Sequence, residues 1–247
     1  MILLIDAGNT RVKWRVVTAS EPLQAVDEGA LAHDRLAALT TALAAVRSRH
    51  PGLRRAFGCN VAGTEVAATI ARACTGLALD WLRPSAACCG VRNLYEDPAR
   101  LGADRWAALI GARRLHPHAC LVVSAGTATT VDLLAADGDF LGGLILPGVE
   151  LMQQALAHGT AQLPLAEGRF TPTPRRTVDA IRSGCLQAQA GAVERMFRQI
   201  ASEPQALCLL GGGAADSFAG LLEIPLRRVD NLALSGLGAL AAAHDEH

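Results

Sequence analysis

Two segments of the chain join a hydrophobic strand to a turn rich in glycine and hydroxyl or amide side chains. The first is Met1 to Thr10 (MILLIDAGNT) and the second is Leu121 to Thr130 (LVVSAGTATT). In each, a glycine follows the apolar run and permits a backbone bend that a side chain would obstruct. Such a turn can aim several N–H groups at an anion. Because the arrangement occurs twice, the sequence indicates two loops that grip one polyphosphate.

The residues after each turn argue against a Walker-type loop. Residues 11–17 and 130–134 again have strand-like sequence, so each unit is predicted as strand, turn and strand, whereas a Walker loop leads into a helix. Taken singly, the turn at Asp6-Ala7-Gly8-Asn9-Thr10 also fits an ordinary hairpin, and Gly126–Thr130 also fits plain β-branched strand sequence.

Phosphoryl transfer needs donors around the transferring oxygens, a carboxylate for a divalent cation and a base for the acceptor's proton. In the first turn, Asp6 could hold the cation, while Asn9 and Thr10 offer donors. Lys13 follows closely and is the only lysine of the chain, although alone it also fits a solvated charge on a hairpin. The first turn therefore supplies most of these groups.

A carboxylate and a guanidinium, Asp104 and Arg105, lie in the opening turn of a helix predicted over residues 103–115. One hypothesis makes Asp104 the general base and Arg105 the group that holds an anion. The alternative is an Asp stabilised by the helix dipole beside a solvated Arg. Adjacent helix positions point apart, so the two need not form an ion pair.

A glycine cluster, LGGGAAD at residues 210–216, follows a predicted strand near the C-terminus. It lacks the third glycine of GxGxxG and no further βαβ unit follows it, which argues against a dinucleotide-binding fold. Two interpretations remain open: a flat surface for an adenine ring, or a tight turn into a helix.

The composition describes a globular protein that can bury a large core. Of its 247 residues, 51% are hydrophobic and 19% are charged, with a formal net charge of zero. The arginines are scattered, so the chain shows no electrostatic footprint for nucleic acid. No window approaches the ~20 apolar residues of a membrane span, and a basic leader is absent, so we expect a cytoplasmic protein without membrane contact.

Strands and helices alternate in both halves of the chain. In the first half we expect strands near 2–6, 11–18, 54–60 and 79–82, and helices over 34–49, 65–74 and 103–115. The second half restarts at strand 120–123 and continues with strands 140–146 and 206–210, helices after 148 and over 178–201 and 232–243, and an extended loop over 159–176. His116-Pro117-His118 interrupts the pattern. The sequence thus predicts an N-terminal lobe, 1–117, with the first turn and the base, and a C-terminal lobe, 118–247, with the second turn and the glycine cluster.

Taken in order, five segments resemble the type III pantothenate kinases, which include the Bvg accessory factors. They are DAGNTRVK at 6–13, GADR at 102–105, SAGTATT at 124–130, GGLILPGVELMQQAL at 142–156 and LGGGAAD at 210–216. The resemblance implies an α/β actin-like ATPase (ribonuclease H-like) fold of two similar lobes with mixed sheets flanked by helices. It also implies a cytoplasmic homodimer that uses ATP with Mg²⁺ to phosphorylate the primary hydroxyl of pantothenate, giving 4'-phosphopantothenate in the first step of coenzyme A biosynthesis.

The resemblance also assigns roles to individual residues. It makes Asp104 the catalytic base, while the carboxylate of Asp6 remains the expected ligand of Mg²⁺ from the chemistry of the first turn. The residues that it implies for ATP binding are Asp6, Ala7, Gly8, Asn9, Thr10, Arg11, Val12, Lys13 and Thr127. Those that it implies for pantothenate binding are Tyr95, Gly102, Ala103, Asp104, Arg105 and Thr177. Thr177 also occupies the expected N-cap position of the helix over 178–201.

One position departs from the family's pattern. Ser124 stands where the second phosphate turn of the family usually opens with an Asp associated with a monovalent cation. A hydroxyl can coordinate K⁺ or NH₄⁺ but contributes no full negative charge, so cation binding should weaken. Two rival functions stay open: a kinase for another small hydroxylated metabolite, and a non-catalytic nucleotide-binding regulatory or accessory protein.

Overall fold

A computed structural model describes residues 1–165 and 167–245 of the chain. It divides into two compact units. Unit 1 contains Met1–Pro117, Gly138–Phe140 and the segment from Asn231 through the last helix, and unit 2 contains His118–Asp137 and Leu141–Asp230. The sequence-based division placed everything after residue 117 in one lobe, whereas the structure groups the last helix with unit 1 because it packs there against the sheet and against a second helix.

Unit 1 is built on a five-stranded mixed sheet in the order β3-β2-β1-β4-β5. β1 pairs antiparallel with β2 and parallel with β4. The strands are β1 (Ile2–Ala7), β2 (Arg11–Val17), β3 (Asp27–Ala32), β4 (Arg55–Asn60) and β5 (Ala78–Trp81). A short hairpin of β6 (Ala87–Cys88) and β7 (Val91–Asn93) is hydrogen-bonded to the second sheet rather than to this one. The helices are α1 (Leu39–Arg49), α2 (Thr64–Ala73), α3 (Ala103–Leu115) and α6 (Leu232–Asp245), with 3₁₀ turns at His33–Ala38 and Pro98–Arg100.

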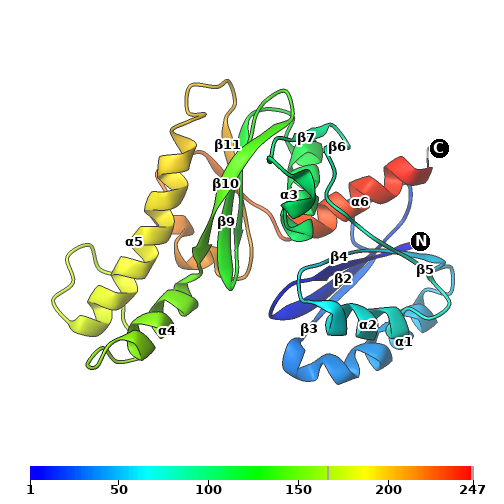
Figure 1. The fold of residues 1–247 in the computed structure, drawn as a ribbon, viewed down its shortest axis with the longest axis horizontal. Helices are drawn as coiled ribbons and strands as arrows, with labels where there is room; N and C mark the ends of the chain where they lie inside the picture. The colour runs from blue at the N-terminus through cyan, green and yellow to red at the C-terminus, as the bar shows by residue number, and fades with distance from the viewer. Residues whose placement is uncertain (166, 246–247) are drawn as a thin grey trace. The chain divides into compact units, whose positions relative to one another are not determined.

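Alternation along β1 decides which side chains face which helices. Leu3 and Ile5 pack on one face with α1 and α2, which lie side by side across the sheet in Figure 1. Ile2 and Leu4 point to the other face and pack against α6 and α3. Asp6 continues this second series, so the period of two directs its carboxylate to the side of the sheet that carries α3 and α6.

Helices α3 and α6 approach each other through two glycines. A Cβ added at Gly111 would lie 2.8 Å from the Gly236 nitrogen, and one added at Gly236 would lie 2.6 Å from the Ala107 carbonyl carbon. Neither site has room for a side chain. The missing Cβ atoms therefore allow the two helix backbones to touch.

Unit 2 repeats the strand order of unit 1. Its strands follow the order β12-β11-β8-β9-β10, and β8 pairs antiparallel with β9 and parallel with β11, just as β1 does with β2 and β4. The strands are β8 (Cys120–Ala125), β9 (Ala128–Leu134), β10 (Asp139–Pro147), β11 (Leu207–Gly211) and β12 (Leu226–Arg228). The first residues of β10, Asp139 and Phe140, belong to unit 1, where they pair with β7. The doubling expected from the two turns thus extends to the topology of both sheets.

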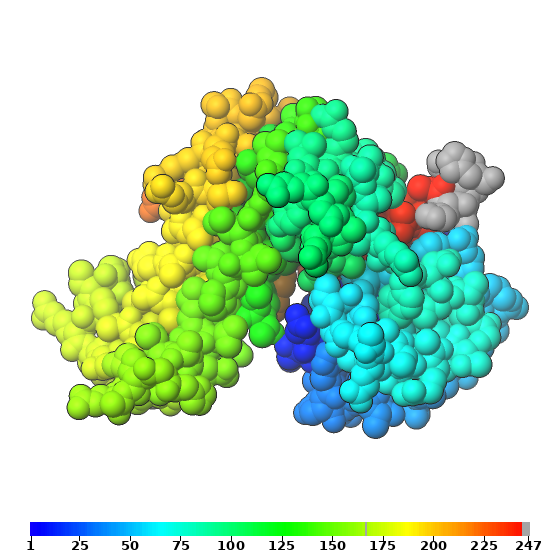
Figure 2. Space-filling model, viewed as in Figure 1, coloured from blue at the N-terminus to red at the C-terminus, as the bar shows by residue number. Residues whose placement is uncertain are grey.

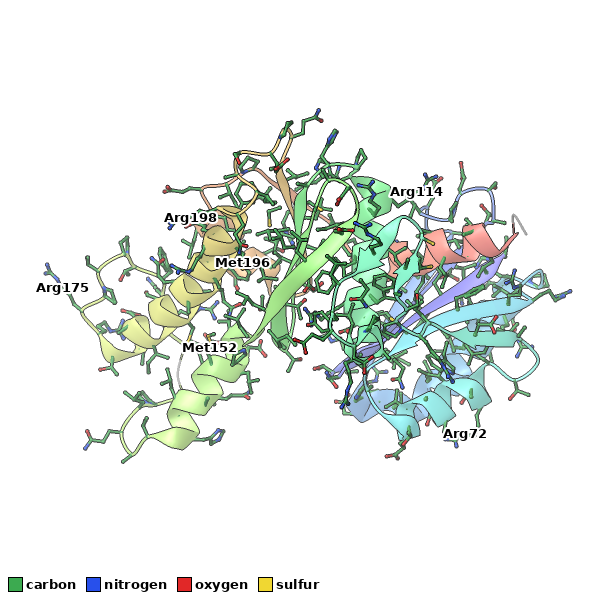
Figure 3. The ribbon with its side chains drawn as sticks, turned by 45° about the horizontal axis from the view of Figure 1, so that its top comes forward. Arg72, Arg114, Met152, Arg175, Met196 and Arg198 are labelled. Atoms are coloured by element: carbon green, nitrogen blue, oxygen red, sulfur yellow. The ribbon has the colours of Figure 1, made fainter. Side chains whose placement is uncertain are left out.

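Two helices cover the core of unit 2. They are α4 (Val149–Gly159) and the long α5 (Thr177–Phe197), with 3₁₀ turns at Ala215–Ser217 and Ala219–Leu221. Met152, labelled in Figure 3, lies where α4 approaches α5, and its sulfur accepts a 3.5 Å hydrogen bond from Gln189. The expectation that Thr177 caps α5 is wrong, because Arg176 precedes the helix as N-cap and makes no side-chain capping bond. Thr177 is the first helical residue.

Candidate active site

The first turn joins β1 to β2 as a tight hairpin. The Gly8 N–H donates to the Arg11 carbonyl at 3.1 Å, and the His33 N–H donates to the Thr10 carbonyl at 3.0 Å. The side chains of Asn9, Thr10 and Arg11 are exposed, whereas Ala7 and Val12 are buried in the core. Of the predicted ATP-binding segment, Ala7 and Val12 therefore offer only backbone, and the turn residues between them offer side chains to a ligand.

Asp6 is on β1, the strand that lies between β2 and β4 in the sheet. In the sheet register it is opposite Lys13 on β2 and Cys59 on β4. One carboxylate oxygen accepts a hydrogen bond from the Cys59 thiol at 3.6 Å, and the other accepts one from the Asn231 amide at 3.1 Å. Burial raises the pKa of Cys59 well above its ordinary value, with the charges of Asp6 and Asp104 adding to the effect. Cys59 is therefore a neutral donor.

Asp104 lies in the first turn of α3, where the predicted base was placed. Its Oδ1 accepts the Arg105 backbone N–H at 2.8 Å, and Gly102 precedes the helix as N-cap. Burial raises the pKa of Asp104, and the negative charge of Asp6 raises it further, against the lowering effect of the Arg105 N–H. A carboxylate whose pKa is raised toward neutrality is a better proton acceptor than a solvated one.

The Arg105 side chain turns away from Asp104 and into an aromatic corner. Its guanidinium donates to the Tyr95 hydroxyl at 2.8 Å and lies 5.6 Å from the Tyr95 ring centre and 5.8 Å from that of Phe140. The two rings are stacked with centroids 5.3 Å apart. Arg105 is only 6% exposed, which excludes the solvated arginine of the alternative interpretation. Buried guanidinium groups are suited to holding carboxylates or phosphates.

The second turn lies in unit 2, between β8 and β9. The Gly126 N–H donates to the Ala128 carbonyl at 3.0 Å, and the Thr127 side chain is exposed. The Gly148 N–H donates to the Thr127 carbonyl at 2.8 Å, and a Cβ at Gly148 would clash with the backbone oxygens of the turn. The segment around Pro147-Gly148, which resembles the family's sequence, therefore packs directly against the backbone of the second turn.

The glycine cluster and Ser124 are neighbours of this second turn. Ser124 lies opposite Gly211 on β11 and opposite Thr130 on β9. Gly212 has a φ of +97°, and its backbone touches Ala125 too closely to admit a side chain. The cluster thus abuts the strand end that carries the turn.

The predicted site residues fall into two groups. The first turn, Tyr95 and residues Gly102–Arg105 belong to unit 1, and Thr127, Ser124, the glycine cluster and Thr177 belong to unit 2, where Thr177 is exposed. Sequence motifs do not point to three residues that contact the group in unit 1: Cys59, Phe140 and Asn231. The only local signal was the Asp-Asn pair before the last helix, which is typical of an N-cap.

Two further features of the structure concern membrane insertion and metal binding. Within residues 1–165 and 167–245, no helix has both the length and the apolar character needed to traverse a bilayer. The same described residues contain no group of three or more His, Cys, Asp or Glu side chains arranged to hold a metal ion.

Solved structures with the same fold define the class of protein. One neighbour is a protein from Sinorhizobium meliloti assigned as a 2-dehydro-3-deoxygalactonokinase, with a TM-score of 0.62, 17% identity and coverage of 100% of this chain and 99% of that one. Another is the activator of 2-hydroxyisocaproyl-CoA dehydratase from Clostridium difficile with bound ADPNP, with a TM-score of 0.53, 12% identity and coverage of 99% and 94%. The expected α/β actin-like ATPase fold is confirmed.

Sequence comparison then gives the family within this class. A model of the type III pantothenate kinases matches residues 2–199. A type III pantothenate kinase of Aromatoleum aromaticum is 62% identical over 243 residues, which cover 98% of either chain. The chain belongs to the type III pantothenate kinase family, and it is an enzyme of the phosphotransferase class, as the two phosphate turns predicted.

Proposed function

We propose that this enzyme transfers the γ-phosphoryl group of ATP to the primary hydroxyl of pantothenate, forming 4'-phosphopantothenate for coenzyme A biosynthesis. The observation that carries the proposal is the placement of Asp104. It is a half-buried carboxylate at a helix N-terminus with a raised pKa, beside the Asp6 charge and next in sequence to the buried guanidinium of Arg105. Family membership supports pantothenate as the acceptor, and the position of Asp104 supports its role as the base.

In the proposed reaction Asp104 accepts the proton of the pantothenate hydroxyl as that oxygen attacks the γ-phosphorus. A new O–P bond forms, the bond between the γ-phosphorus and its bridging oxygen breaks, and ADP leaves. Arg105 binds the carboxylate of pantothenate while Tyr95 orients the guanidinium through its 2.8 Å hydrogen bond. Thr177 is a further contact for pantothenate, and Lys13, with the residues of both turns, including Thr127, binds the phosphates of ATP.

The Asp6 carboxylate fits a divalent cation. Carboxylate oxygens are ligands that Mg²⁺ prefers, and the two side chains that donate hydrogen bonds to Asp6 are neutral, so neither forms an ion pair with it. We propose that Asp6 holds Mg²⁺ directly or through water. When bound, the ion would neutralise part of the charge on the phosphate oxygens.

An exposed apolar surface on unit 2 supports a homodimer. Leu141 and Ile145 on β10 are 52% and 65% exposed, and Leu151 on α4 is 40% exposed. Figure 2 shows β10 and α4, green to yellow-green, at the surface of this unit. Contiguous exposed apolar groups often mark protein interfaces. We expect Ile145→Glu to convert the dimer to monomer in light scattering, and a wild-type monomer would contradict the assignment.

Two finer points follow from the same family. We propose a cytoplasmic location, because the reaction consumes ATP and feeds coenzyme A synthesis. We also propose that K⁺ or NH₄⁺ binds near the second turn only weakly, because Ser124 offers a neutral hydroxyl where the family's Asp would offer a charge.

The decisive test is ADP release by purified enzyme with ATP and Mg²⁺, with and without pantothenate. We expect pantothenate-dependent release that Asp104→Asn lowers by ~10²- to 10⁴-fold while ATP binding persists. Asp80→Asn, which changes an exposed carboxylate on β5 of the same unit, serves as the matched control and should retain full turnover. ATP binding without acceptor-dependent turnover in the wild type would favour the regulatory alternative, and turnover with another hydroxylated acceptor would favour a different kinase.

A further inference from the structure

Asn231 occupies a position that joins two parts of unit 1 separated by 225 residues in sequence. It lies immediately before α6 and is 8% exposed. Its Oδ1 accepts the Leu234 N–H at 2.9 Å, which caps the helix, and its Nδ2 donates to Asp6 Oδ2 at 3.1 Å. One amide group therefore fixes the start of α6 and one oxygen of the Asp6 carboxylate.

Cys59 holds the other oxygen from the opposite side. It is fully buried on β4, in register with Asp6, and its thiol donates to Oδ1 at 3.6 Å. Each Asp6 oxygen thus accepts one hydrogen bond from a neutral side chain and keeps its remaining lone pair for another partner. A lysine or arginine in either place would fix the carboxylate equally well but would cancel its charge.

We propose that Asn231 and Cys59 are positioning residues that hold the Asp6 carboxylate in the orientation that receives the divalent cation and nucleotide. This inference rests on the role given to Asp6 in the proposed function. It assigns the C-terminal helix a function at the site through its first turn, in addition to its packing against α3. Side chains that orient a cation-binding carboxylate typically change affinity or activity by ~10- to 100-fold when removed.

Two substitutions separate this role from helix capping. Asn231→Ser keeps a side-chain oxygen that can cap α6 but is too short to reach Asp6, and Asn231→Ala removes both functions. If Asn231 positions Asp6, both variants lose ~10-fold or more in kcat and in Mn²⁺ affinity in the presence of ADP, measured by electron paramagnetic resonance, with pantothenate KM little changed. If Asn231 acts only as a cap, the serine variant keeps wild-type values, and that result overturns the proposal.

Substitutions at Cys59 test the proposal independently, and a substitution at Cys74 serves as their control. Cys59→Ser retains an O–H donor and should bind Mn²⁺ nearly as the wild type does, whereas Cys59→Ala should bind it more weakly. Cys74→Ala, which removes a buried thiol elsewhere in unit 1, should leave Mn²⁺ affinity unchanged. Equal affinity in Cys59→Ala and wild type would overturn the role of Cys59. Because Mn²⁺ and ADP binding are measured without the acceptor, a wild type that binds both but does not phosphorylate pantothenate would refute the proposed substrate and leave the positioning role intact.

Discussion

The contact between α3 and α6 gives a prediction whose size follows from the structure. In Gly236→Ala the new Cβ would lie 2.6 Å from the Ala107 carbonyl carbon and nearer still to its oxygen. Ordinary contact begins near 3.4 Å. The obstacle is helix backbone, which cannot rotate out of the way as a side chain can. Restoring ordinary contact with this carbonyl group therefore requires the helices to separate by about 1 Å or more, and overpacking of this kind costs about 1–3 kcal/mol.

For a chain of this length, that cost should lower Tm by about 2–12 °C, at about 2–4 °C for each kcal/mol. Turnover should fall as well at a temperature where the variant is folded, because α3 carries Asp104 and α6 begins at Asn231. A displacement of about 1 Å at a catalytic group can reduce the rate by about 100-fold. Differential scanning calorimetry and the ADP-release assay measure the two effects.

Gly184→Ala is the matched control for this substitution. Gly184 lies within α5, and a Cβ there would meet nothing within 4 Å. Alanine is favoured over glycine inside a helix by about 0.5–1 kcal/mol, so this variant should be slightly more stable than the wild type. Gly236→Ala with an unchanged Tm and unchanged kcat would refute the inferred closeness of the two helices.

Three further predictions concern single side chains of the site. Asp104→Asn should raise Tm at pH 7, because the raised pKa of Asp104 means that its ionisation costs more free energy in the folded than in the unfolded chain. This gain in Tm should vanish below pH 3.8, the ordinary pKa of an aspartate, where the carboxyl is protonated in both states. A difference in Tm that does not change with pH would contradict the prediction. Phe140→Leu should raise the KM for pantothenate about tenfold or more, because the Arg105 guanidinium loses an aromatic contact that holds it in place. The KM for the uncharged alcohol analogue of pantothenate should change little. Equal effects on both acceptors would refute the role of Phe140 in positioning Arg105. Ser124→Asp should increase activation by K⁺ over Na⁺, and an unchanged ratio would exclude Ser124 from a cation site.

Helices and strands could be predicted from the sequence where the hydrophobic residues follow a regular helical or strand pattern. β1, β2 and α3 have strong apolar runs or clear boundaries, and α3 was predicted at its observed limits. β3 was missed because its sequence, DEGALA, is charged and small, and it is defined by pairing with β2 rather than by propensity. The three-residue strands β7 and β12 also depend on neighbouring strands for their existence.

The site residues likewise divide into those that local sequence indicates and those that depend on tertiary packing. Asp6, Asp104 and Arg105 could be predicted because each belongs to a short motif in which local residue types indicate chemistry. The aromatic corner around Arg105 could not, since Phe140 is an apolar strand residue whose role depends on stacking with Tyr95. Asn231 was equally hidden, because its contact with Asp6 follows from the packing of the last helix against the first strand.

The electrostatics of unit 1 explain why neutral donors surround Asp6. The Asp6 charge contributes to the raised pKa of Asp104, so a cationic partner for Asp6 would lower that pKa and weaken Asp104 as a base. Cys59 and Asn231 fix the carboxylate without this effect, since burial and the adjacent acidic groups keep the thiol protonated. In the proposed mechanism the Asp6 charge therefore acts at two stages: it raises the pKa of Asp104 in the free enzyme, and it attracts the cation that accompanies the nucleotide.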